Sequence, residues 1–232
     1  MAGETGERDR WLLAIDSSTE EVGVALSAGH RTAEINWTAS RDQTVTVLDQ
    51  IDRLLGLMRI EPPALAAVAV ATGPGMFNGL RVGMSIAKGL VIGLDVPVIG
   101  VSTLEATAFP YAVVGLPVIP VVGAGRGRLV WATYEHQAGE LVQVEAPRNG
   151  TVHELAGRIE SIPDRVIVCG ELTAEQAEVL TALPAVRLPA DGVRNRRAAA
   201  MLARARARLA DGEFDDAVTL EPLYLHATKR LA

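Results

Sequence analysis

The chain has 232 residues, of which 49% are hydrophobic and 22% charged, so it is not a disordered chain, and this length fits one large domain or two small lobes. A net charge of −6 argues against a protein whose whole surface binds nucleic acid. One cysteine excludes an intrachain disulfide and suits a reducing cytoplasm. No apolar run reaches membrane-spanning length, so we expect no membrane association.

The first half of the chain predicts strands that give way to helices. Residues 1–10 are polar and are expected to be a disordered leader. The first three predicted strands form an antiparallel meander, and apolar residues at helical spacing then begin the first helix. The predicted strands are residues 11–15, 22–26, 32–37, 67–71 and 96–101. The predicted helices are residues 42–58 and 80–94, with a third beginning near Ser102.

The second half repeats this order more loosely. Its predicted strands are residues 118–122, 129–134, 141–144, 166–170 and 186–188, and its predicted helices are residues 152–161, 172–182 and 195–210. Alternating strands and helices predict an α/β fold. The order of the elements, occurring roughly twice, predicts an N-terminal lobe over residues 11–104 and a second lobe over residues 105–232.

Two polar segments are candidates for binding phosphate. Asp16, Ser17 and Ser18 follow the first strand, where hydroxyls and amides can donate to phosphate and a carboxylate can hold Mg²⁺. Gly73 and Gly75 lie in a loop that ends where a helix begins, a setting that favours anions. The alternative for both segments is an ordinary turn, which the same residue types favour.

A row of residues with little or no side chain, here called a bare row, lies along the predicted helix over 80–94 and the residue before it. Gly79, Gly83 and Ala87 recur every four residues and therefore share one helical face. Such a face lets another element approach the backbone closely. That element is either the protein's own sheet or a helix of another subunit, and the sequence leaves both readings open.

A row of arginines lies along the last predicted helix, residues 195–210, and the residue before it. No acidic residue occurs between positions 192 and 210, and the arginines at 194, 197, 204 and 208 project from one side of a helix. Arg197, Arg204 and Arg208 are therefore candidate contacts for RNA phosphates. The alternative is a solvated helix face.

Protease and metal chemistry find little support in the sequence. The histidines at positions 30, 136, 153 and 226 include no H-x-x-x-H pair, so we predict no metal site. Ser85 lies inside a predicted helix rather than at a strand-to-helix turn, which argues against a nucleophile elbow. Cys169 stands among Val and Ile and is interpreted as a small buried hydrophobe.

Two segments resemble the TsaB family, once labelled glycoprotease-like. They are the run LAIDSST at residues 13–19 and the run TGPGMFNGLRVGMSIAKGL at residues 72–90, the latter similar to a long glycine signature of that family. The chain departs from the family pattern at Gln43, in a segment where relatives often carry R-G-H-S-E. It departs again at Gly123, where relatives often carry an aspartate.

This resemblance implies an actin-like/Hsp70-like ATPase architecture of two lobes with mixed sheets. It also implies a non-catalytic partner of a TsaD-like paralogue and a TsaE-like ATPase in tRNA modification. That assembly transfers threonylcarbamoyl to N6 of the adenosine beside the anticodon of ANN-reading tRNAs. The implied interface lies on the helices over 42–58 and 79–94. Its candidate residues are Leu48, Ile51, Gly79, Arg81, Gly83 and Ala87.

The resemblance also bears on ligands and assembly. No tightly bound cofactor is expected, with ATP or ADP and Mg²⁺ as candidates at the interface with the partner. A homodimer is the expected alternative when the partner is absent. The competing hypothesis for the chain is a small actin-like kinase or ATPase that uses Asp16 with Mg²⁺.

Overall fold

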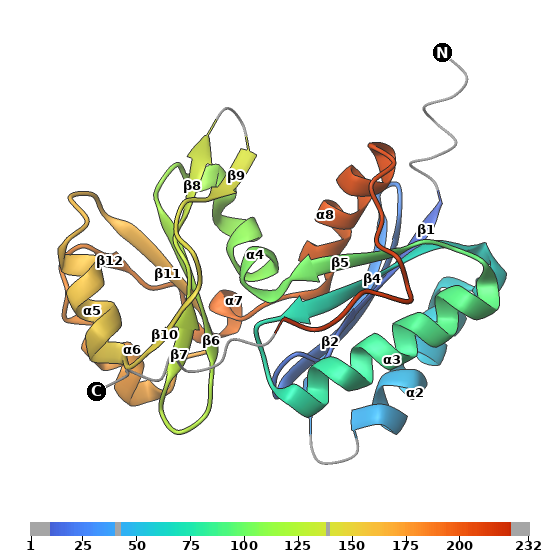
Figure 1. The fold of residues 1–232 in the computed structure, drawn as a ribbon, viewed down its shortest axis with the longest axis horizontal. Coiled ribbons are helices and arrows are strands. Elements are labelled where there is room, and N and C mark those ends of the chain that lie inside the picture. The colour runs from blue at the N-terminus through green and yellow to red at the C-terminus, as the bar shows by residue number, and fades with distance from the viewer. Residues whose placement is uncertain (1–9, 40–42, 138–139, 224–232) are drawn as a thin grey trace. The chain divides into compact units, whose positions relative to one another are not determined.

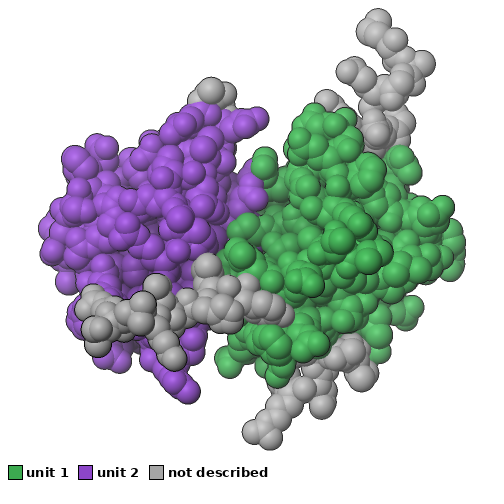
Figure 2. Space-filling view, in the orientation of Figure 1, with its two compact units in different colours: residues 1–102, 197–223 green, residues 103–196, 224–232 purple. Residues whose placement is uncertain are grey.

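The computed structural model describes residues 10–39, 43–137 and 140–223, and these form two compact units (Figures 1 and 2). The first unit holds residues up to Ser102 together with Arg197–Leu223, and the second holds Thr103–Arg196. The prediction of one second lobe over residues 105–232 is therefore wrong for residues 197–223, which return to the first unit. The expected leader, apart from Arg10, lies outside the described residues.

The first unit is a five-stranded sheet covered on both faces by helices. Its elements are β1 (Trp11–Asp16), β2 (Glu21–Ala28), β3 (Arg31–Thr38), α2 (Gln43–Met58), η1 (Pro62–Ala64), β4 (Leu65–Gly73), α3 (Phe77–Leu94), β5 (Val98–Ser102) and α8 (Ala198–Ala210). The strand order is β3-β2-β1-β4-β5. The first three strands form the predicted antiparallel meander, and β1, β4 and β5 run parallel.

Burial along β1 shows how this sheet is covered. All six of its residues are buried. Leu13 and Ile15 pack in the core under α2 and α3, whereas α8 contacts β1 and β2 from the other face. Because successive strand side chains point to opposite faces, a strand covered on both faces is apolar throughout rather than alternating. The short apolar runs of the sequence are therefore correctly predicted as buried strands.

The second unit is built on a seven-stranded sheet. Its elements are α4 (Thr103–Ala108), η2 (Phe109–Val114), β6 (Val118–Gly123), β7 (Leu129–Trp131), β8 (Tyr134–Gln137), β9 (Glu140–Gln143), β10 (Arg148–Gly150), α5 (Val152–Glu160), β11 (Val166–Gly170), α6 (Ala174–Thr181), β12 (Val186–Arg187) and α7 (Asp191–Arg194). The main strand order is β10-β7-β6-β11-β12, and β8 pairs with β6 and β9.

The second sheet, like the first, contains both parallel and antiparallel strand pairs. Strand β6 runs parallel to β11 and antiparallel to β7. One core lies on the side of α5 and α6, and a second lies on the side of α4 and η2. The predicted strand over 129–134 is divided into β7 and the start of β8, and β10 was not predicted. Two mixed sheets, each with helices on both faces, confirm the expected α/β class.

Candidate functional site

The turn after β1 closes on its own polar side chains. Asp16 and Ser17 are each 2% exposed, and Ser18 is fully buried. The amide and the hydroxyl of Ser18 both donate to Asp16 Oδ1, at 3.0 and 2.6 Å. An aspartate that accepts from the residue two positions on forms an Asx-type turn. The Asp16 carboxylate is thus engaged inside the turn that carries it.

The glycine-rich loop packs directly on this turn. The Met76 amide donates to the Ser18 carbonyl at 2.6 Å. A Cβ at Gly75 would lie 2.2 Å from the same carbonyl oxygen, so only glycine allows this approach. Gly73 has φ +105° and its peptide bond to Pro74 is cis. The two segments lie together, but they bond to each other and do not form an outward-facing phosphate cradle.

The bare row of α3 faces the protein's own sheet. Ser17 Oγ donates to the Gly79 carbonyl at 2.8 Å. A Cβ at Gly83 would lie 2.5 Å from Ser17 Oγ and 3.6 Å from Ile15 Cγ2. Ala87 is fully buried in the same core. The prediction that Gly79, Gly83 and Ala87 form a docking surface is therefore wrong, because these residues let α3 approach β1.

The remaining predicted interface residues, on α2 and α3, include both buried and exposed side chains. Ile51 is 4% exposed and packs in the core of the first unit, so its placement in an interface is also wrong. Leu48 is 47% exposed, and Arg81 is exposed on α3. Leu48 and Arg81 are thus the two predicted interface residues that the structure leaves on the surface.

The outward face of α3 carries features that the sequence analysis missed. Ser85, Gly89 and Gly93 are exposed and form a second bare row, and no atom lies within 4 Å of a Cβ built at either glycine. An open depression of about 450 Å³ is lined by Asn78, Arg81, Val82, Ser85 and Ile86. Both bare rows have helical spacing, so periodicity alone does not tell which one faces the sheet.

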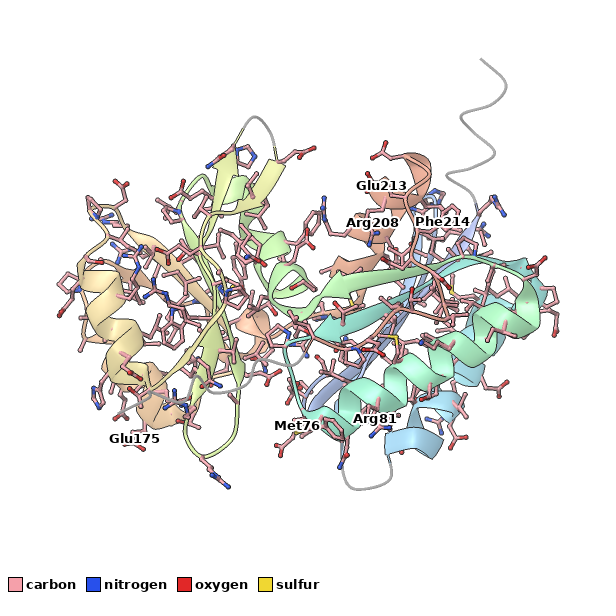
Figure 3. All side chains as sticks on the ribbon, viewed as in Figure 1. Met76, Arg81, Glu175, Arg208, Glu213 and Phe214 are labelled. Carbon is pink, nitrogen blue, oxygen red and sulfur yellow. The ribbon has the colours of Figure 1, made fainter. Side chains whose placement is uncertain are left out.

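Arg81 is one of the residues that line this depression. Its guanidinium carbon is 5.0 Å from the centroid of the Phe77 ring, within the range of a cation–π contact. Figure 3 shows Arg81 and Met76 at the beginning of α3, distant from the labelled residues near the end of α8. The outward face of α3 therefore presents a stacked cation beside an exposed aromatic ring.

The arginines that border α8 bind their own unit. Nε and Nη2 of Arg197 donate to Glu34 Oε2 at 2.8 and 2.6 Å, and this hydrogen bonding raises the pKa of Arg197. Nη1 of Arg208 donates to the Gly100 carbonyl at 2.8 Å and to Asp215 Oδ2 at 3.2 Å. Arg204 is only partly exposed. The prediction of a free arginine stripe is therefore wrong for Arg197 and Arg208, because their side chains tie α8 to its surroundings. Contact of Arg204 with RNA stays a prediction.

A carboxylate that the sequence analysis missed lies beside Gly123. The parallel strands β6 and β11 end side by side, and a Cβ at Gly123 would lie 3.9 Å from Glu171 Oε2. Arg196 pairs with Glu171 at 3.3 Å, and the Arg196 side chain is 1% exposed. The second unit therefore carries a partly buried ion pair beside Gly123, at the end of β11.

Other candidate chemistry is buried or absent among the described residues. Cys169 is fully buried, and burial raises the pKa of its thiol, as its interpretation as a small hydrophobe predicts. Within residues 10–39, 43–137 and 140–223, no three His, Cys, Asp or Glu side chains gather closely enough to hold a metal ion. None of the helices that the structure describes is long and apolar enough to cross a membrane.

Two mixed sheets that follow one another along the chain, with a glycine-rich loop packed on the turn between β1 and β2, define a two-sheet α/β fold. A solved structure from Bacteroides thetaiotaomicron, described as a protein with actin-like ATPase fold and unknown function, matches with a TM-score of 0.51 at 8% identity, covering 87% of this chain and 97% of that one. At that identity the likeness shows the fold alone.

The sequence comparisons narrow this class. A family model described as TsaD, tRNA N6-adenosine threonylcarbamoyltransferase, matches residues 37–176, more than half of the chain. Curated proteins named tRNA threonylcarbamoyladenosine biosynthesis protein TsaB align at 32–43% identity, and the chain spans 41–61% of their length. The one from Haemophilus influenzae is 43% identical over 97 residues, which is 42% of this chain and 41% of that protein.

A solved structure titled YeaZ from Pseudomonas aeruginosa matches over nearly the whole chain. Its TM-score is 0.77 at 25% identity, and the match covers 93% of this chain and 99% of that one. The chain therefore belongs to the TsaB family, within the group that the TsaD-type model describes.

Proposed function

We propose that this chain is the non-catalytic subunit of an assembly that transfers threonylcarbamoyl to N6 of the adenosine beside the anticodon in ANN-reading tRNAs. In this proposal it docks onto a TsaD-like paralogue, which carries out the transfer. The observation that carries the proposal is the 32–43% identity to proteins named for threonylcarbamoyladenosine biosynthesis. The fit to a TsaD-type family model supports a partner of related fold.

The outward face of α2 and α3 is the proposed docking surface. Leu48 and Arg81 are exposed there, and the bare row of Ser85, Gly89 and Gly93 lets a partner helix approach the α3 backbone. Exposed apolar side chains beside a shallow depression are typical of a surface that another protein covers. In this proposal the docking surface lies on the same two helices as expected, but on α3 it uses the exposed row of Ser85, Gly89 and Gly93 instead of the buried row of Gly79, Gly83 and Ala87.

The first-unit turn supports a non-catalytic role. Asp16, the residue on which a kinase or ATPase mechanism would depend, is 2% exposed and accepts both donors of Ser18. Its neighbour Gly75 is in direct contact with the Ser18 carbonyl. These residues do not fit a phosphate with its Mg²⁺ in the described structure. In our proposal, any ATP or ADP and Mg²⁺ bind at the interface with the partner.

The remaining parts of the assembly follow from the same proposal. A TsaE-like ATPase joins the pair, and tRNA is bound by the complex rather than by the arginines around α8. The same outward face forms a homodimer when the paralogue is absent. The chain acts in the cytoplasm, where tRNA is modified.

Reconstitution tests the proposed function. The chain is combined with the cognate TsaD-like and TsaE-like proteins, tRNA and threonylcarbamoyl-adenylate, and formation of the modified adenosine is measured by mass spectrometry of digested tRNA. We expect product only when the chain is present. Full transfer without the chain refutes the proposal. ATP turnover by the isolated chain, lost in Asp16→Ala, favours the kinase hypothesis instead.

A further inference from the structure

Residues 213–223, here called the C-terminal strap, lie beyond α8 and are fastened to the edge of the first sheet. The Asp215 amide donates to the Val98 carbonyl at 2.9 Å, and Asp215 Oδ2 accepts from the Gly100 amide at 2.7 Å. Arg208 donates to the same Asp215 oxygen. Figure 1 shows the strap, in dark red, leaving the end of α8 and running back along β4 and β5. The strap thus covers the edge strand β5.

The strap then reaches α3. Nζ of Lys88, on α3, donates to the Val218 carbonyl at 3.3 Å. Ala217 and Leu220 pack against the core beneath α2 and α3. Near its end, the Leu223 amide donates to the Thr72 carbonyl at 2.7 Å, beside the glycine-rich loop. The strap is therefore a neighbour of α3 from the middle of the helix to its beginning.

The large exposed hydrophobic side chains among the described residues of the first unit lie on only a few elements. Among the described residues of that unit, the exposed large hydrophobics lie on α2, on α3 and on the strap. They are Leu48, Leu57, Phe77, Ile92, Phe214, Val218 and Leu223. The outer surfaces of β3 and α8 carry none of this set. This clustering is unlike the scattered single apolar residues of an ordinary surface.

Two of the strap residues continue the outward face of α3. Val218 is 83% exposed and is held against Lys88, which lies one turn before Ile92, itself 73% exposed. Leu223 is 48% exposed beside the loop that precedes α3. Phe214 instead lies by Arg208 and Glu213 near the end of α8 (Figure 3). The apolar surface therefore runs from α2 across α3 to Val218 and Leu223.

We propose that the docking surface for the TsaD-like paralogue extends onto the C-terminal strap, where Val218 and Leu223 contact the partner directly. This inference rests on the proposed function, which supplies the occupant. It adds that the partner covers two helices together with a third, extended segment drawn from the end of the chain. Burying the exposed side chain of Val218 removes apolar surface from water, which favours association.

The inference explains the fastening of the strap. An isolated extended segment would lose conformational entropy on binding, which weakens association. The Asp215 contacts to Gly100 and Arg208, together with the core packing of Leu220, hold Val218 and Leu223 in place before the partner arrives. Pre-ordering of this kind raises affinity without additional contacts.

The test compares variants of the full chain in binding to the purified TsaD-like paralogue by calorimetry. Val218→Asp is expected to weaken binding by about tenfold or more, since an apolar contact is lost and a charge is desolvated. Val218→Ser should weaken it in the same direction but less. Val113→Asp is the matched control, because Val113 is 91% exposed but lies in the second unit. Circular dichroism verifies that each variant is folded.

Leu48→Asp, on α2, separates this inference from the proposed function. If Leu48→Asp weakens binding while Val218→Asp binds like the unmodified chain, the strap is not part of the surface and the inference is wrong. If neither variant changes binding, the docking surface itself is wrong. If Val218→Asp abolishes self-association of the chain and leaves binding to the paralogue unchanged, a second copy is the occupant and the inference is also overturned.

Discussion

The two faces of α3 carry similar sequence patterns and opposite structural roles. The inward row of Gly79 and Gly83 lets the helix lie on β1, with the hydroxyl of Ser17 filling the space that a side chain would occupy. The outward row of Gly89 and Gly93 faces open space. A bare row on a helix therefore indicates that another element packs closely on the helix. Only the fold tells whether that element belongs to the protein's own sheet or to a partner.

The largest expected effect comes from filling the inward row. Gly83→Leu places a side chain where Ser17 Oγ lies 2.5 Å from the first added carbon. Overpacking of a close-packed core usually costs about 1–3 kcal/mol, and a whole leucine in this space should exceed that range. We expect a loss of more than about 3 kcal/mol in the free energy of unfolding, measured by urea denaturation. A stably folded Gly83→Leu variant that fails only in docking would reverse the assignment of the two faces.

A double-mutant cycle tests whether the hydroxyl of Ser17 is the group that requires glycine at position 83. Gly83→Ala should cost about 1–3 kcal/mol in the unmodified chain, because its Cβ meets Ser17 Oγ. In a Ser17→Ala background the nearest Ser17 atom is Cβ, 3.7 Å from that position, so the added methyl should be tolerated. Ser17→Ala alone should cost about 1 kcal/mol for its lost hydrogen bond to the Gly79 carbonyl.

The cycle has a clear null result. Stabilities of the four proteins are compared by thermal and urea unfolding, and the coupling energy should be about 1–2 kcal/mol. Additive effects of the two substitutions would mean that Gly83 is required by the backbone of β1 rather than by the Ser17 side chain.

The comparison of the two rows also shows what the sequence could predict. Helices α5 and α6 match the predicted helices over 152–161 and 172–182, and both begin with a capping box, Thr151 with Glu154 and Thr173 with Gln176. Each capping box joins two residues that are three positions apart, so it can be recognised from the local sequence. The meander and the apolar strands are similarly local, and the long glycine signature led to the correct family.

Features that depend on distant contacts were not predictable in this way. Strand β10 has three residues and exists because it pairs with β7. The return of α8 to the first unit depends on contacts such as that of Arg197 with Glu34, which is 163 positions away. Arg208 also pairs with an acidic residue outside its helix, because Asp215 lies beyond the end of α8. Charge patterns along one helix do not reveal partners that the fold brings to it.

Substitution in the outward row should have a smaller effect on stability and the opposite sign. Gly89 is exposed and nothing surrounds its Cβ position, so Gly89→Ala should stabilise the chain by about 0.4–1 kcal/mol by reducing the freedom of the unfolded state. The measurement is the shift in urea midpoint against Gly83→Ala in the same helix. Destabilisation by Gly89→Ala would indicate that this face is already occupied in the folded chain.

Arg81 gives the smallest expected change in stability. Its contact with the Phe77 ring is exposed, so Arg81→Ala should lower the free energy of unfolding by about 0.5 kcal/mol. If the outward face docks the paralogue, the same substitution should weaken binding by severalfold, because arginine and aromatic side chains are favoured anchors of interfaces. Arg165→Ala, at an exposed arginine of the second unit, is the control and should leave binding unchanged. Equal binding losses in both variants would indicate a general effect of charge and would remove Arg81 from the docking surface.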